Sequence, residues 1–239
     1  MRRRIYLPLM LAAAPGLMAL GLVTPASAAG SSNGVANKSA NQIVTAATSA
    51  VNGAKSFTYG GTTRSNGIST GLKVSLSSSG DGQGTLTSSG QPVKLIKIGD
   101  ILYVSSTAAF WTKNLGADAG RTLGTKWVAA SSTNSDYAGI ANLFQAQQIT
   151  GQFLSTANTT YTKGKTSTVN GQAVIAVVGK SGSTVNTIYV ATTGKPYVVS
   201  ITSPGKNGGT LNFTNYNKPV NPTAPPNPIT VPTSTTTTG

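Results

Sequence analysis

A strict alternation of apolar and polar residues over Ile68–Ser77 constrains the fold more than any other feature of the chain. Ile68, Leu72, Val74 and Leu76 share one side of the alternation, and the other side carries only Ser, Gly and Lys. Successive side chains of a β-strand point to opposite faces of a sheet, so the pattern predicts a strand with one dry and one wet face. Such strands are typical of an antiparallel sheet that is covered on a single side.

Further strands are expected at hairpin spacing along the chain. Turn signals such as Asn170-Gly171 and Gly194-Lys195-Pro196 separate short runs that are rich in β-branched residues. A Thr-rich strand is expected before Asn170. The other expected strands are 56–64, 68–77, 84–88, 93–98, 101–105, 126–130, 173–178, 185–191, 197–202 and 210–216.

Three segments carry helical periodicity instead. Apolar residues recur at helical spacing over 41–54, where Ser39 or Asn41 can cap the helix. The segments 108–115 and 136–154 repeat this pattern, the second with Ser135-Asp136 as its expected cap. Helices with one apolar face would cover the dry face of the sheet. The sequence therefore predicts an α+β fold that is mainly β.

The two ends of the chain differ in composition from its middle. Residues 1–28 combine a basic start, a long uncharged run and a small-residue site at Ala26-Ser27-Ala28, which predicts a cleaved Sec export signal. The uncharged run is also long enough to stay as a membrane anchor. Residues 29–39 are expected to be flexible, 40–222 to form one domain, and 223–239, rich in Pro and Thr, to be a disordered tail.

The inventory of reactive side chains argues against catalysis. The chain has no His and no Cys, and its acidic residues are Asp81, Asp100, Asp118 and Asp136, each in turn or cap surroundings. A His-based triad, a thiolate nucleophile and a His/Cys zinc site are therefore excluded. Catalysis by two carboxylates would require two of these Asp to meet, which nothing in their spacing indicates. We expect a non-enzymatic protein without metal or cofactor.

Positive charge dominates, with a formal net charge of +14. The Lys and Arg residues beyond the export signal are spread singly, so no stripe could neutralise a run of phosphates and no nucleic acid partner is expected. A diffuse positive field favours anionic membrane or cell-wall surfaces, and equally serves the solubility of a chain that is poor in charge. Without Cys, a thioether-linked lipid anchor is excluded, so the exported protein is expected to be extracellular or in the cell envelope.

Several short motifs carry a resemblance to a known family. They are Gly99-Asp100-Ile101-Leu102-Tyr103, the aromatic pair Phe110-Trp111, Lys126-Trp127-Val128, Gly171-Gln172-Ala173, Ile188-Tyr189-Val190, Gly209-Thr210-Leu211-Asn212-Phe213, Pro219-Val220 and Ala224-Pro225-Pro226. Together they resemble the LolA/LolB-like half-barrel family, and within it most of all the LppX/LprG-type lipoproteins of actinobacteria. The match runs from about residue 40 to residue 226, and the lipid-attachment Cys of those lipoproteins is missing.

The resemblance implies a strongly curved antiparallel sheet of about nine to eleven strands, with helices over its concave face. It also implies an apolar cavity that holds the acyl chains of a lipid or an acylated molecule. The candidate lining residues are Leu72, Val74, Ile96, Ile98, Leu102, Val104, Phe110, Trp111, Ile188, Val190, Leu211 and Phe213. Each could equally pack against the helices. The alternative is a monomeric structural or interaction module of the bacterial cell envelope with a core filled by its own side chains.

Overall fold

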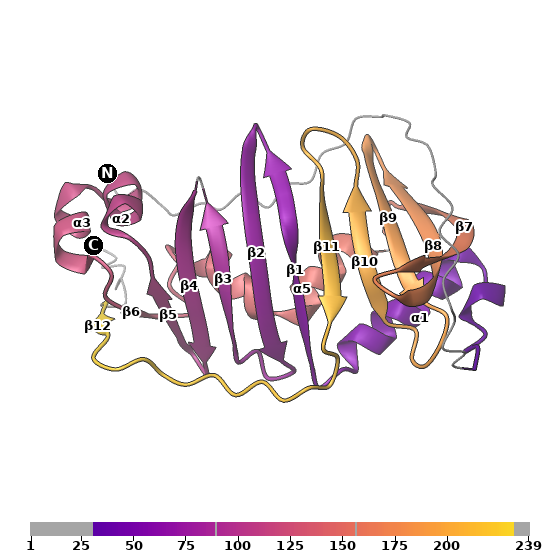
Figure 1. Cartoon of the computed structure of the whole chain (residues 1–239), viewed down its shortest axis with the longest axis horizontal. Coiled ribbons are helices and arrows are strands. Elements are labelled where there is room, and N and C mark those ends of the chain that lie inside the picture. Colours follow the sequence, from indigo (N-terminus) through magenta and orange to yellow (C-terminus); the bar gives the residue numbers. More distant parts are fainter. Residues whose placement is uncertain (1–30, 89, 156, 232–239) are drawn as a thin grey trace, which may run out of the picture.

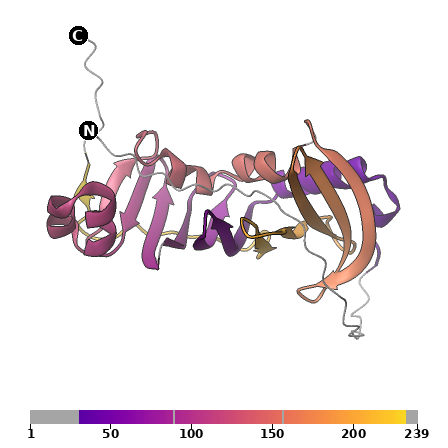
Figure 2. The same ribbon diagram turned by 90° about the horizontal axis from the view of Figure 1, so that it is seen from above.

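The fold is one large open sheet with helices on one face, as the sequence predicted (Figure 1). The computed structural model describes residues 31–88, 90–155 and 157–231. Twelve strands form this sheet, which does not close into a barrel. Figure 2 shows α1 (Ala40–Asn52) and α5 (Ala146–Leu154) on the concave side, with the sheet curling most strongly at one end. The α+β half-barrel class is therefore confirmed, with one strand more than the expected maximum.

Two antiparallel meanders make up the sheet. The first consists of β1 (Ser56–Ser65), β2 (Ile68–Ser77), β3 (Gly82–Ser88), β4 (Gln91–Ile98), β5 (Ile101–Ser105) and β6 (Val128–Ser131). The second consists of β7 (Thr160–Val169), β8 (Gln172–Ser181), β9 (Thr184–Ala191), β10 (Val198–Ser203) and β11 (Gly209–Thr214). The meanders join where β1 pairs with β11, from Thr58↔Thr214 to Thr63↔Gly209.

The expected helix at the start of the domain is present as α1, capped as predicted. The Ser39 side chain accepts a hydrogen bond from the Gln42 backbone, and the Gln42 side chain accepts one from the Ser39 backbone. This reciprocal pair is a capping box, which satisfies backbone N–H groups that the first helical turn leaves without partners. The helix buries Ile43, Val44, Ala47 and Val51, the apolar positions that the periodicity selects.

The helical insert is more broken than the sequence predicted. The expected helix over 136–154 is divided into α4 (Ala138–Ala141), the 3-10 turn η2 (Asn142–Phe144) and α5, because Gln145 is extended. The expected Ser135-Asp136 cap is wrong, because α4 begins after Tyr137 without a side-chain cap. In the turn before it, the Asn134 side chain accepts a hydrogen bond from the Asp136 backbone at 2.9 Å. After the expected α2 (Ala108–Leu115) comes an unexpected α3 (Ala117–Leu123), in which Gly120 weakens the helical signal.

Both ends of the described chain are more structured than expected. In the segment 31–39, Val35 is buried in the turn η1 (Val35–Asn37), and Ser32 bridges to Thr193. After β11 the chain runs along one end of the strands (yellow in Figure 1) and forms β12 (Ile229–Thr230), which pairs in parallel with β6. We call residues 215–231 the strap. Composition alone does not predict the strap, because an extended Pro-rich segment forms a strand only where a free sheet edge can pair with it. The predicted export signal and residues 232–239 lie outside the described residues.

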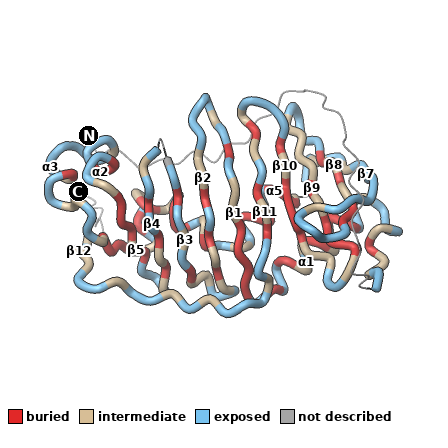
Figure 3. The backbone as a smooth tube through the Cα atoms, in the orientation of Figure 1, coloured by how far each residue is buried: buried red, intermediate tan, exposed pale blue. Residues whose placement is uncertain are grey.

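Burial alternates along the strands, so that one face of the sheet is dry (Figure 3). The dry face and the helices over it share one continuous apolar cluster. Its largest fully buried side chains include Trp111, Tyr59, Phe57 and Phe144. Within the described ranges, the helices are all too short or too polar to cross a bilayer.

Candidate functional site

Ten of the twelve predicted lining residues lie together on the concave side. They are Leu72, Val74, Leu102, Val104, Phe110, Trp111, Ile188, Val190, Leu211 and Phe213, all buried in the main cluster. Trp111 has no exposed surface, and its ring meets that of Phe110 edge-on at 5.1 Å between centroids. Whether any of them contacts a ligand stays a prediction, because here they contact one another and the helices.

Ile96 and Ile98 are the two that do not join this set. In β4, Val93 and Leu95 are buried, whereas Ile96 is paired with Gln83 of β3 on the opposite, convex face. The sequence is ambiguous here because both registers of this strand are apolar. The odd-numbered register also turns Lys97 inward, where it is only 9% exposed and its Nζ donates to the Gly99 carbonyl at 2.7 Å.

The middle of the concave face is filled by the chain's own side chains. Phe144 of η2 is completely buried and lies against Gly82 of β3, where an added Cβ would come within 2.9 Å of the Phe144 ring. The Tyr59 hydroxyl donates to the Leu143 carbonyl at 2.8 Å, which ties η2 to the central strand β1. Burial raises the pKa of Tyr59 far above its ordinary value, so this donor stays protonated.

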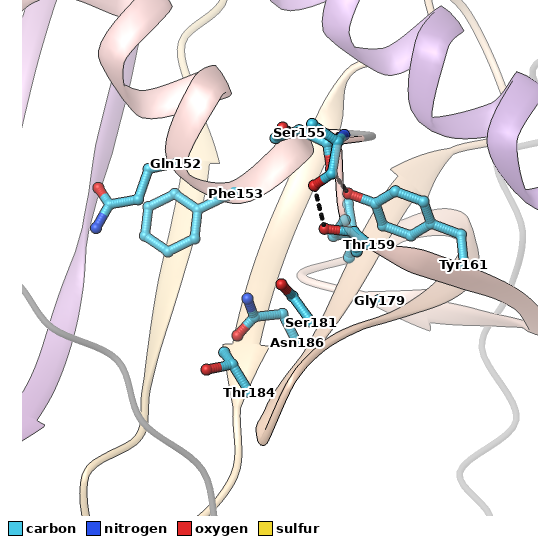
Figure 4. A pocket seen from close by; sticks show the side chains of 11 residues that line it. Gln152, Phe153, Ser155, Thr159, Tyr161, Gly179, Ser181, Thr184 and Asn186 are labelled. Carbon is cyan, nitrogen blue, oxygen red and sulfur yellow. Dashed lines mark hydrogen bonds between the residues drawn. The ribbon is translucent and has the colours of Figure 1, made fainter.

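An open pocket remains nearer the curled end, between α5 and the hairpins β7–β8–β9 (Figure 4). Its volume is about 250 Å³. Phe153 at the end of α5 and Ile188 of β9 are its buried apolar residues. The other residues around it are Gln152, Ser155, Ala157, Thr159, Tyr161, Gly179, Ser181, Thr184 and Asn186.

Tyr161 shapes one wall of this pocket. Its ring lies over Gly179 of the neighbouring strand, where an added Cβ would come within 2.6 Å of the ring atom Cε1. Its hydroxyl donates to the Ser155 carbonyl at 2.8 Å and so ties β7 to the segment that follows α5. Burial raises the pKa of Tyr161, and a hydrogen bond with the Thr159 side chain lowers it by less. The phenol therefore stays neutral at physiological pH.

The rim of the pocket is polar and uncharged. The hydroxyls of Thr159, Ser181 and Thr184 surround it, and the Asn186 side-chain carbonyl accepts from the Ser203 hydroxyl. None of the lining residues is Lys, Arg or Asp. Such a site suits a neutral polar group with an apolar extension, since a charged group would find no counter-charge there.

The carboxylates lie elsewhere in turns and short helices. Asp81 accepts a hydrogen bond from the Gly99 backbone at 2.7 Å, and Asp118 pairs with Arg121 at the surface. In the part of the chain that the structure describes, no group of three or more His, Cys, Asp or Glu could hold a metal ion. The pocket therefore offers binding contacts without a nucleophile and base in reach of each other.

Sequence reasoning found only Ile188 among the pocket residues. Thr184 and Asn186 continue the alternation of Ile188 and Val190 toward the start of β9, so extending that pattern would have located two more. The Tyr161–Gly179 contact joins two strands and follows from their register, for which the sequence gives no separate signal.

Comparison with the solved structure of LprF from Mycobacterium bovis supports the architecture. It has a TM-score of 0.52 at 13% identity, covering 78% of this chain and 96% of its own. The lipoprotein LppX from Mycobacterium tuberculosis has a TM-score of 0.48 at 15% identity, covering 76% of this chain and 96% of its own. No family model and no curated protein sequence matches the chain. At these identities the likeness to LprF shows the fold alone.

Proposed function

We propose that this protein is a non-enzymatic carrier that holds an acyl chain of a lipid or lipoconjugate, entering at the pocket between α5 and β7–β9. The observation that carries the proposal is the layout of this pocket. The apolar residues Phe153 and Ile188 are buried, and an uncharged polar rim surrounds them. An acyl tail would contact the apolar residues, while an ester, amide or sugar group would meet the hydroxyls of the rim.

The size of the pocket sets a condition on this function. At about 250 Å³ it is slightly smaller than the roughly 300–1,000 Å³ of common ligand pockets. A long tail therefore requires α5 to move away from the sheet. Because Gln145 is extended, α5 is a separate helix from α4, and such a movement would have to break the hydrogen bond from the Thr150 hydroxyl to the Asn52 side chain of α1. Each methylene buried would contribute about 0.8 kcal/mol.

Export is part of the proposal. The basic, apolar and small-residue pattern over 1–28 supports Sec export, and the missing Cys leaves the mature chain without a thioether-linked lipid. A carrier outside the cytoplasm would protect acyl chains from water between membrane or wall sites.

The test is competition of monoacylglycerols with chains of ten to eighteen carbons against a fluorescent monoacylglycerol, together with native mass spectrometry of the gently purified chain. We expect affinity to rise with chain length and to change little with salt, since the rim carries no charge. Ser181→Trp blocks the rim and should weaken binding at least about tenfold, or about 1.4 kcal/mol. Ser183→Trp, in the turn just beyond, is the matched control and should bind as the natural chain does.

One observation favours a second function, a structural or interaction module of the envelope. Trp111 of α2 and Phe144 of η2 are completely buried in the chain's own apolar core, and Trp111 is expected to keep its fluorescence when lipid is added. If the purified chain carries no acyl species and binds none of the monoacylglycerols tested, the carrier proposal is wrong and the module remains.

A further inference from the structure

Figure 2 shows α1 and α5 on one face of the sheet. The opposite, convex face carries a depression of about 430 Å³ with both polar and apolar walls, which we call the convex groove. Its lining residues are Lys73, Ser75, Gln83, Gly84, Thr85, Lys94, Leu95, Ile96 and Trp127. Register brings these side chains together, because Thr85 of β3 pairs with Lys73 of β2 on one side and with Lys94 of β4 on the other. The two lysines therefore stand on either side of Thr85.

A second depression of about 430 Å³ continues the groove toward β11. It shares Lys73 and Thr85 with the first. This depression exists because Gly60 of β1 and Gly71 of β2 have no side chains, whereas residues of the neighbouring strands do. Its remaining walls are mostly hydroxyl and amide groups, from Thr58, Thr62, Thr87, Asn212 and Thr214. The path crosses the strands from β11 to β6, and six strand spacings make about 29 Å.

Charge along this path has one sign. Lys73 and Lys94 line it, and none of the four Asp residues lines either depression. Trp127 closes the far end, and the strap fixes it there because its carbonyl accepts from the Ile229 backbone at 2.8 Å. The groove thus combines two cations, a partly exposed indole, the aliphatic side chain of Ile96 and a row of neutral hydrogen-bonding groups.

We propose that the convex groove binds an acidic glycan, a sugar chain that carries carboxylates or phosphates. Lys73 and Lys94 would bind the anionic groups, a sugar ring would lie on the face of Trp127, and Thr85 and Gln83 would hydrogen-bond the hydroxyls. A recessed path that carries two lysines and an indole fits a single anionic sugar chain better than a flat lipid surface. The large exposed apolar side chains that a membrane would take up, Ile68, Ile101 and Leu115, lie outside both depressions. The inference does not depend on the acyl pocket, which opens on the other face.

Calorimetric titration of the full-length protein with three oligosaccharides tests the proposal. The probes are heptagalacturonate, a phosphorylated mannopentaose and neutral maltoheptaose, with phosphatidylglycerol vesicles as a separate arm. We expect at least one acidic probe to bind at least ten times more tightly than maltoheptaose, with an affinity that falls as salt screens the lysines.

Two double variants with the same net charge distinguish binding in the convex groove from nonspecific attraction to a positively charged protein. Lys73→Gln with Lys94→Gln should weaken binding of the acidic probe at least tenfold, and Trp127→Ala should weaken it severalfold. Lys195→Gln with Lys206→Gln, at exposed sites outside both depressions, should change it less than twofold. Equal losses in the two double variants, binding to vesicles alone, or no preference for the acidic probes would each overturn the proposal. Thermal melting of every variant verifies that it is folded.

Discussion

The two faces of the sheet differ most clearly at the two tryptophans of the chain. Trp111 is fully buried on the concave side, and its indole N–H is one of the few buried polar groups without a hydrogen-bond partner among the described residues. Trp127 belongs to the convex face, is partly exposed and borders the convex groove. The alternation of side chains thus produces one face that is buried and stabilises the fold, and an opposite face that is available for binding. Substitutions on the two faces should accordingly separate stability from binding.

The largest expected effect tests this separation directly. Trp111→Ala should lower the free energy of unfolding by about 4 kcal/mol, because it removes a large buried side chain and leaves a cavity. Trp127→Ala should cost about 1 kcal/mol or less, as is usual for surface substitutions away from the core. Urea denaturation followed by circular dichroism measures both. Similar losses for the two variants would remove the distinction between the faces.

Two strand glycines compare the same two faces, with smaller expected changes in stability. Gly82 faces the core, and a methyl group there would collide with the Phe144 ring and the Ser75 carbonyl, so Gly82→Ala should cost about 2 kcal/mol. Gly71 lies on the convex face, where the nearest atom to an added Cβ is the Thr87 Cβ at 3.8 Å. Gly71→Ala should therefore be neutral or stabilising by up to about 1 kcal/mol. Denaturation midpoints distinguish the two outcomes, and a Gly71→Ala loss as large as that of Gly82→Ala would contradict them.

Alkaline pH probes the dry face through Tyr59. Burial raises the pKa of its phenol, so the folded state holds the proton more tightly than the unfolded state does. Its contribution to stability is complete below pH 10, where the unfolded tyrosine begins to ionise, and is lost as the pH rises further. Above pH 10 the natural chain should lose up to about 1.4 kcal/mol per pH unit more than Tyr59→Phe does. Denaturation curves from pH 8 to 11 give these slopes, and parallel slopes would show that Tyr59 is not buried as described.

Sequence reasoning succeeded where one periodicity dominated. The strand Ile68–Ser77 and the helix Ala108–Leu115 have the predicted bounds, because their apolar residues fit only one pattern. It was less successful where two patterns compete. In β4 both registers are apolar, so the inward choice of Leu95 over Ile96 depends on pairing with Val104 of β5. The break at Gln145 and the position of the strap likewise depend on surfaces that distant parts of the chain supply.

The pocket shows the same limit. Its apolar residues follow from local patterns, since Phe153 is a periodic helix position and Ile188 a periodic strand position. Its walls depend on tertiary contacts, namely the Tyr161 ring over Gly179 and the Asn186 amide held by Ser203. Propensity cannot report contacts between residues that are distant in the chain.

The pairing of β1 with β11 implies an order in which the strands pair during folding. Every other antiparallel pair of neighbours links strands that are consecutive in the chain, while this joint brings Thr58 to Thr214. Short hairpins close within microseconds, whereas closing a long loop costs more entropy and slows folding. We expect the two meanders to form first and the central seam to close last. Until β11 leaves the ribosome, β1 therefore has one unpaired edge, and the newly made protein is most exposed to wrong pairing at the centre of its final sheet.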